Sequence, residues 1–122
     1  MGIRVLVVED EPIVALDIRQ QLDDAGFEVL GPATSVAKAL QLIAEPGCDV
    51  AVLNVNLGNE TSEPIAQKLQ ASGKPFVVLS GYPTDNLAPP LKGATFLTKP
   101  VLMAELVAAV RKCMTRLDSS DH

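Results

Sequence analysis

Short apolar runs alternate with stretches of helical periodicity along the whole chain, and this alternation restricts the fold more than any other feature. Between the runs, apolar residues recur every three or four positions, as they do on one face of a helix. The five runs with strand character are 3–8, 27–33, 49–54, 75–80 and 94–98. Strand–helix alternation with connections of a few residues predicts a mainly parallel sheet with helices on both faces.

Start and stop signals predict where the helices between these runs begin and end. Pro12 suits the first turn of a helix, where its missing N–H costs nothing, and Gly26 ends that helix. Ser35 is the cap of a second helix, which ends at 46–47, and Gly73 ends a third. The long last helix carries an apolar stripe formed by Met103, Val107, Val110, Met114 and Leu117.

The composition of the strands predicts their order in the sheet. The runs 5–8, 50–53 and 76–79 are apolar without interruption, as strands buried on both faces are. The strands at 27–30 and 94–98 include polar residues, as edge strands do. We therefore expect the order 2-1-3-4-5, with strands numbered along the chain. The predicted fold is α/β, a doubly wound (βα)5 flavodoxin-like three-layer sandwich.

The pattern predicts one domain over residues 1–122, with an ordered core at about 3–117 and a frayed C-terminal tail. One segment fits it badly. Three prolines interrupt residues 83–93, and a proline inside a helix costs about 3 kcal/mol. The fourth helix should therefore be short or irregular. Because this segment lies next to Ser80, we expect it to carry a partner-specific surface.

Composition excludes several classes of function. The net charge of −5 argues against nucleic-acid and anionic-membrane binding, because both need a basic face. Cys48 and Cys113 lie far apart and belong to no metal-binding motif, so we expect reduced thiols. The chain begins directly with a strand-like run, and no apolar run reaches the length of a membrane span. These features predict a cytoplasmic protein.

Polar residues follow four of the five predicted strands, at the point where each strand ends. The carboxyl ends of parallel strands meet at one edge of the sheet, which is where ligands bind in such folds. The residues delivered to that edge are Glu9 and Asp10, then Asn54 and Asn56, then Ser80, and finally Lys99. Any one of these residues alone could serve only the turn after its strand, but their occurrence at matching strand ends indicates a functional site.

Four segments of the sequence resemble the signature blocks of response-regulator receiver domains, as in the chemotaxis response regulator. They are "VLVVEDE", "DVAVLNVNL", "VVLSGY" and "LTKP", in the right order and spacing. The resemblance extends over roughly 3–117 and is specific, because four blocks tied to four strand ends are hard to imitate. It implies a stand-alone receiver of a two-component phosphorelay that signals through protein–protein contacts.

The resemblance also implies roles for individual residues. Glu9 and Asp10 match the acidic pair that holds Mg²⁺, and the backbone carbonyl of Asn56 matches a third protein ligand. Ser80 matches the hydroxyl residue that moves toward a bound phosphoryl group, and Lys99 matches the lysine that pairs with its oxygen. Two further positions are Phe96, which matches the aromatic switch residue, and Pro100, which is a candidate for a preceding cis bond.

Asn54 departs from the pattern of the family, which has the phosphoacceptor Asp at this position. An amide oxygen is a weak nucleophile, and no stable acyl phosphate forms from it. The substitution also removes an anionic metal ligand, so we expect weak Mg²⁺ binding. Three readings of Asn54 remain open: a polar strand terminator, a natural phosphorylation-independent receiver, or an engineered Asp→Asn change. Retention of Glu9, Asp10, Ser80 and Lys99 favours engineering or recent loss.

Two enzyme-like or cofactor-binding alternatives have less support. A small Mg²⁺-dependent phosphatase of similar topology could use Asp10, but the second acid expected two residues after a nucleophilic Asp is missing. A flavodoxin-like cofactor binder would need a phosphate-binding loop, and the loop after the first strand is acidic. The expected partners are a histidine kinase or a histidine phosphotransfer protein. Part of the last helix could also form a homodimer contact.

Overall fold

The computed structural model describes residues 3–80, 95–98 and 102–120. Its main sheet has five parallel strands in the order β2-β1-β3-β6-β7, which confirms the predicted order. The strands are β1 (Arg4–Val8), β2 (Glu28–Ala33), β3 (Val50–Asn54), β6 (Phe76–Ser80) and β7 (Thr95–Thr98).

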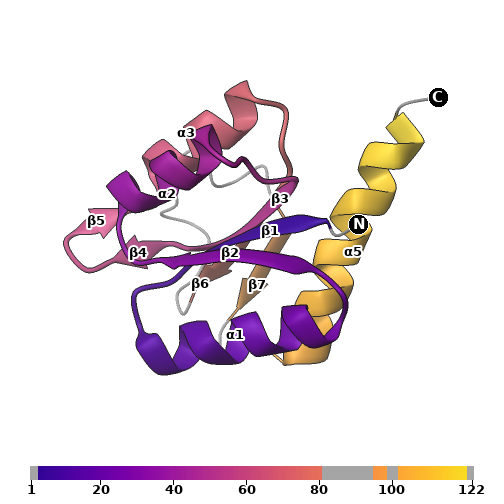
Figure 1. Cartoon of the computed structure of the whole chain (residues 1–122), viewed down its shortest axis with the longest axis horizontal. Coiled ribbons are helices and arrows are strands. Elements are labelled where there is room, and N and C mark those ends of the chain that lie inside the picture. Colours follow the sequence, from indigo (N-terminus) through magenta and orange to yellow (C-terminus); the bar gives the residue numbers. More distant parts are fainter. Residues whose placement is uncertain (1–2, 81–94, 99–101, 121–122) are drawn as a thin grey trace.

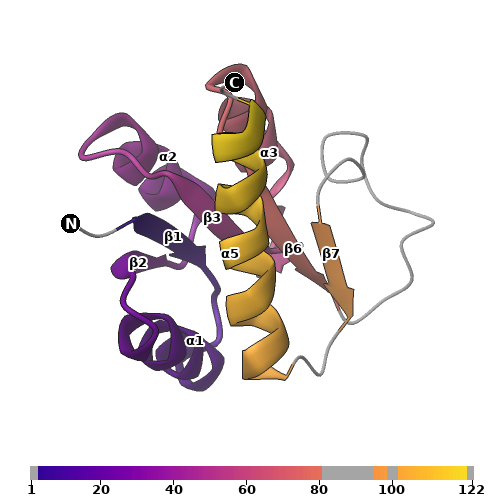
Figure 2. The same ribbon diagram turned by 90° about the vertical axis from the view of Figure 1, so that its right-hand side faces the viewer.

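Helices cover both faces of this sheet, so the predicted three-layer architecture is confirmed (Figure 1). They are α1 (Pro12–Asp24), α2 (Val36–Ala44), α3 (Glu63–Ala71) and α5 (Met103–Ser120). The helices α2 and α3 lie on one face, and α1 and α5 lie on the other. Figure 2 shows α5 crossing the sheet in front of β3 and β6. No helix in the described part of the chain is long and apolar enough to cross a membrane.

The core forms two layers because side chains alternate between the two faces of each central strand. Leu6, Leu53 and Val78 belong to the layer under α2 and α3. Val7 and Val52 belong to the layer under α1 and α5. All are fully buried or nearly so, and burying one such side chain stabilises the fold by roughly 1.5–3 kcal/mol. The continuous apolar runs of these strands are therefore explained by burial on both faces.

A glycine at the edge of the sheet helps to position the first acidic residue. The pairing of β1 with β2 shifts register between Leu6 and Val8, next to Gly31, which has a φ of 96°. A Cβ atom at Gly31 would lie 2.8 Å from the carbonyl oxygen of Val7, so only glycine fits. Beyond this irregularity, the N–H of Glu9 donates to the carbonyl of Ala33 at 3.0 Å.

The structure differs from the sequence-based expectation at one place. A two-stranded antiparallel hairpin, β4 (Asn56–Leu57) and β5 (Glu60–Thr61), lies between β3 and α3 and was not predicted. The last helix runs to Ser120, and the ordered core at about 3–117 stays a prediction. The Pro-rich segment 83–93, with the expected short fourth helix, lies outside the described residues.

Candidate functional site at the carboxyl edge of the sheet

Three neighbouring strands bring polar side chains to the carboxyl edge of the sheet. Glu9 and Asp10 follow β1, Asn54 is the last residue of β3, and Ser80 is the last residue of β6. The register of the sheet places Glu9 and Asn54 side by side along the strands. β1 and β3 pair Val8 with Leu53, and each of these residues comes one position before the polar residue. The structure therefore brings these strand-end residues to the same edge of the sheet.

The side-chain amide of Asn54 is the centre of this group. Its Nδ2 atom lies 2.8 Å from the carbonyl oxygen of Asn56, 3.1 Å from Oε2 of Glu9 and 3.4 Å from Oδ1 of Asp10. Asn54 is only 8% exposed. Three oxygen atoms from three residues thus converge on one nitrogen, which donates to them.

The surroundings of Asn54 determine which way its amide points. The opposite orientation would turn Oδ1 toward the same three oxygens, and an amide oxygen has no proton to donate. Two of those oxygens belong to the side-chain carboxyl groups of Glu9 and Asp10, so the contact would be repulsive. The amide therefore presents its nitrogen to the acid pair.

Glu9 and Asp10 have different environments. Glu9 is 1% exposed, and its Oε2 atom also accepts from the backbone N–H of Glu11 at 3.2 Å. Asp10 is half-buried, and its second oxygen accepts from the backbone N–H of Gly58 at 3.0 Å. Asp10 thus joins the Asn54 amide to the turn of the β4–β5 hairpin.

The β4–β5 hairpin is the part of the site that sequence reasoning missed. Gly58, with a φ of 63°, is the first residue of its two-residue turn. The N–H of Ser62 closes the hairpin on the carbonyl of Val55 at 2.9 Å. A carboxylate oxygen of Glu60 accepts from the N–H of Val36, the first residue of α2, at 3.2 Å. A Gly-Asn pair between short polar–apolar segments is a hairpin signal that could have revealed this element.

The other residues predicted for the site are described only in part. The backbone of Phe96 pairs with Val78 in the sheet, and its side chain is outside what the structure describes. Lys99 and Pro100 also lie outside the described residues, so the lysine role and the cis bond stay predictions. Ser80 is 3% exposed at the end of β6. Its predicted role in moving toward a phosphoryl group also stays a prediction.

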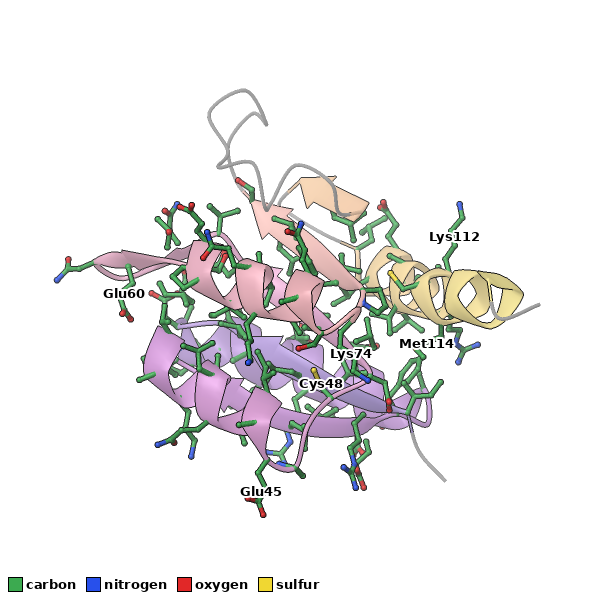
Figure 3. All side chains as sticks on the ribbon, turned by 90° about the horizontal axis from the view of Figure 1, so that it is seen from above. Glu45, Cys48, Glu60, Lys74, Lys112 and Met114 are labelled. Carbon is green, nitrogen blue, oxygen red and sulfur yellow. The ribbon has the colours of Figure 1, made fainter. Side chains whose placement is uncertain are left out.

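A polar pocket of about 620 Å³ lies at the opposite, amino edge of the sheet. Its charged groups include Arg4 and Glu28, which form an ion pair at 2.8 Å. Burial raises the pKa of the Cys48 thiol to about 11; the nearby Lys74 opposes this shift and Asp49 adds to it. Figure 3 shows Cys48 beside Lys74. The thiol is therefore protonated near neutral pH and unsuited to nucleophilic chemistry.

The fold is a doubly wound α/β domain, with paired acids after its first strand and a polar residue at the end of its third. The sequence matches the response regulator receiver domain family over residues 5–111. The chain therefore belongs to this family, and the resemblance seen in the four sequence blocks is confirmed.

Known proteins similar to this chain are regulators. It is 34% identical to the transcriptional regulatory protein PrrA of Mycobacterium tuberculosis, an alignment that covers 96% of this chain and 52% of that protein. It is 28% identical to PdtaR of the same species, covering 93% of this chain and 57% of that protein. The chain thus spans about half the length of these relatives.

Solved receiver structures have the same fold. SdrG from Sphingomonas melonis Fr1 is 32% identical, with a TM-score of 0.78, and the match covers 93% of this chain and 97% of that one. A response regulator receiver protein from Sinorhizobium medicae WSM419 is 26% identical, with a TM-score of 0.81, over 93% of this chain and 95% of that one.

Family membership identifies a signalling protein rather than a classical enzyme. Receiver domains act in phosphorelay signalling, interact with histidine kinases or phosphotransfer proteins, and generally bind Mg²⁺ at their acidic pocket. Neither the family match nor the regulator relatives support the phosphatase alternative. Within the described residues, no three His, Cys, Asp or Glu side chains are grouped as a metal site would require.

Proposed function

We propose that this chain is a receiver that acts through protein–protein contacts and takes no phosphoryl group at position 54. The orientation of the Asn54 amide carries the proposal. A phosphoacceptor needs an ionised oxygen directed at the incoming phosphorus. At position 54 a nitrogen that carries two protons faces the pocket, at 3.1 Å from Glu9.

The residues around position 54 support a receiver rather than an unrelated domain. The carboxyl groups of Glu9 and Asp10 lie beside the Asn54 amide, and Asn56 directs its carbonyl into the same pocket. We propose that these are the receiver's acid pair and carbonyl, with Asn54 at the acceptor position. Ser80 and Lys99 retain the hydroxyl and ammonium groups of the family pattern. The proposed function applies to the chain that carries Asn54, whether this asparagine is the natural residue or the result of an engineered Asp→Asn change.

The expected partners are proteins of the phosphorelay: a histidine kinase or a histidine phosphotransfer protein, with a second copy of the chain as another candidate. The negative net charge supports protein partners over nucleic acid or an anionic membrane surface. Both cysteines are buried and neither forms a disulfide, which is compatible with a reducing compartment, and we propose the cytoplasm.

The test is intact-mass spectrometry after incubation with acetyl phosphate and Mg²⁺. We expect no mass change for the unaltered chain. The Asn54→Asp variant should gain one phosphoryl group, about 80 Da. An Asn59→Asp variant is the matched control, because it adds the same charge at an exposed position in the hairpin turn. A phosphoryl adduct on the unaltered chain would overturn the proposal.

A further inference from the structure

The metal that the family uses does not fit this pocket as it is arranged. Mg²⁺ requires near-octahedral oxygen ligands at about 2.0–2.1 Å. The oxygens that could serve it, from Glu9, Asp10 and Asn56, converge instead on the Asn54 Nδ2 atom at 2.8–3.4 Å. These are hydrogen-bond distances, longer than Mg²⁺–oxygen bonds, and the group on which the three oxygens converge is a proton donor.

The amide nitrogen also supplies what a cation would supply to the acid pair. Two carboxyl groups that share a donor inside a largely buried pocket need positive charge or proton donors between them. Asn54 has two N–H groups for three acceptors. The carbonyl of Asn56 and Oε2 of Glu9 are the two nearer acceptors, and Oδ1 of Asp10 at 3.4 Å is the most distant. Unlike a bound ion, this donor is covalently attached and always present.

Asp10 extends the effect of the amide to the hairpin. While Oδ1 of Asp10 faces Asn54, its Oδ2 accepts from the N–H of Gly58 at 3.0 Å. Two residues further on, Glu60 accepts from the N–H of Val36 at the start of α2. A metal bound to Oδ1 of Asp10 would replace the Asn54 contact of a carboxylate whose other oxygen accepts from the hairpin.

We propose that the Asn54 amide nitrogen is a permanent internal substitute for the divalent cation of receiver domains. It holds the acid pair and the β4–β5 hairpin in one arrangement, with or without Mg²⁺. This inference deepens the proposed function and rests on it, since it takes position 54 as the acceptor position. Its consequence is a receiver surface around the hairpin and the start of α2 that does not respond to metal.

The test is a titration of the ¹⁵N-labelled chain with MgCl₂ alone to millimolar concentration, observed by NMR. The reporters are the side-chain NH₂ signals of Asn54 and the backbone amides of Gly58 and Val36. The Asn54 signals are assigned by their loss in Asn54→Ala. In the unaltered chain we expect no saturable shift of any reporter. In Asn54→Asp we expect saturable shifts of the Gly58 amide, because a third carboxylate replaces the donor.

Asn59→Asp is the matched control, and it should behave as the unaltered chain does. Saturable shifts in the unaltered chain would overturn the inference, and this result does not depend on how the variants fold. Equal responses of Asn59→Asp and Asn54→Asp would also overturn it, since net charge would then be the cause. An unaltered chain that binds Mg²⁺ yet gains no phosphoryl mass would overturn this inference and leave the proposed function intact.

Discussion

The side-chain nitrogen of Asn54 lies 3.1 Å from Oε2 of Glu9, although 45 positions separate the two residues in the sequence. Both side chains are buried, at 8% and 1% exposure. The contact joins the ends of β1 and β3, and it gives a buried carboxyl group a neutral hydrogen-bond donor. The stability of the acid pocket should therefore depend on this amide.

Asn54→Ala should lower the free energy of unfolding. The change removes one of the donors to the buried carboxyl group of Glu9, which keeps the N–H of Glu11, and the loss of one hydrogen bond costs about 0.5–1.5 kcal/mol. Urea denaturation measures the loss. Asn56→Ala is the matched control, because the Asn56 side chain is exposed and only its backbone carbonyl enters the pocket. Equal losses in the two variants would contradict this role of the amide.

Glu60→Ala should destabilise the chain modestly. The Glu60 carboxylate accepts from the N–H of Val36 at the amino end of α2, where a negative charge is favourable, and such contacts contribute roughly 0.5–1 kcal/mol. Glu45 lies at the carboxyl end of the same helix, where a negative charge is unfavourable (Figure 3). Glu45→Ala should thus leave stability unchanged or slightly raised. If chemical denaturation showed a greater loss of stability in Glu45→Ala than in Glu60→Ala, it would contradict the stabilising role of the Glu60–Val36 hydrogen bond.

Cys48 should make stability depend on alkaline pH. Burial raises its pKa in the folded chain from 9.0 to about 11, so the folded state holds the thiol proton more tightly than the unfolded state does. The resulting stabilisation is fully present below pH 9 and is lost as pH rises toward 11. We expect the unfolding free energy to fall over this window by up to about 3 kcal/mol more in the unaltered chain than in Cys48→Ala. Parallel pH profiles of the two proteins would contradict it.

The sequence predicted the fold well because its signals are local. Uninterrupted apolar runs such as 50–53 need only the rule that strands buried on both faces are apolar. Pro12 and Ser35 begin helices for reasons that lie within one turn, and the Ser35 side chain does accept from the N–H of Lys38 at 3.2 Å. Strand order followed from the same burial rule, with Thr95–Thr98 at an edge.

The candidate site was predictable only as a set of residues. That Asn54 would end a strand beside Glu9 follows from the parallel topology. The direction of its amide does not, because it depends on where the Asn56 carbonyl and the acid pair lie in space. The link from Asp10 to Gly58 was missed for a related reason. The Gly58 N–H belongs to a hairpin of two two-residue strands, and that hairpin was not predicted.

The most direct test of the central claim is thermal unfolding of the unaltered chain and of Asn54→Asp, each with EDTA and with Mg²⁺. The variant places three carboxyl groups in one pocket, and two unit charges about 4 Å apart repel by about 4 kcal/mol at an effective dielectric of about 20. We predict that Asn54→Asp melts roughly 15 °C below the unaltered chain in EDTA. We also predict that Mg²⁺ recovers most of this loss and leaves the unaltered chain unchanged. Equal melting points of Asn54→Asp with and without Mg²⁺, or an equal rise in both proteins, would contradict the claim that the Asn54 amide stands in for the metal.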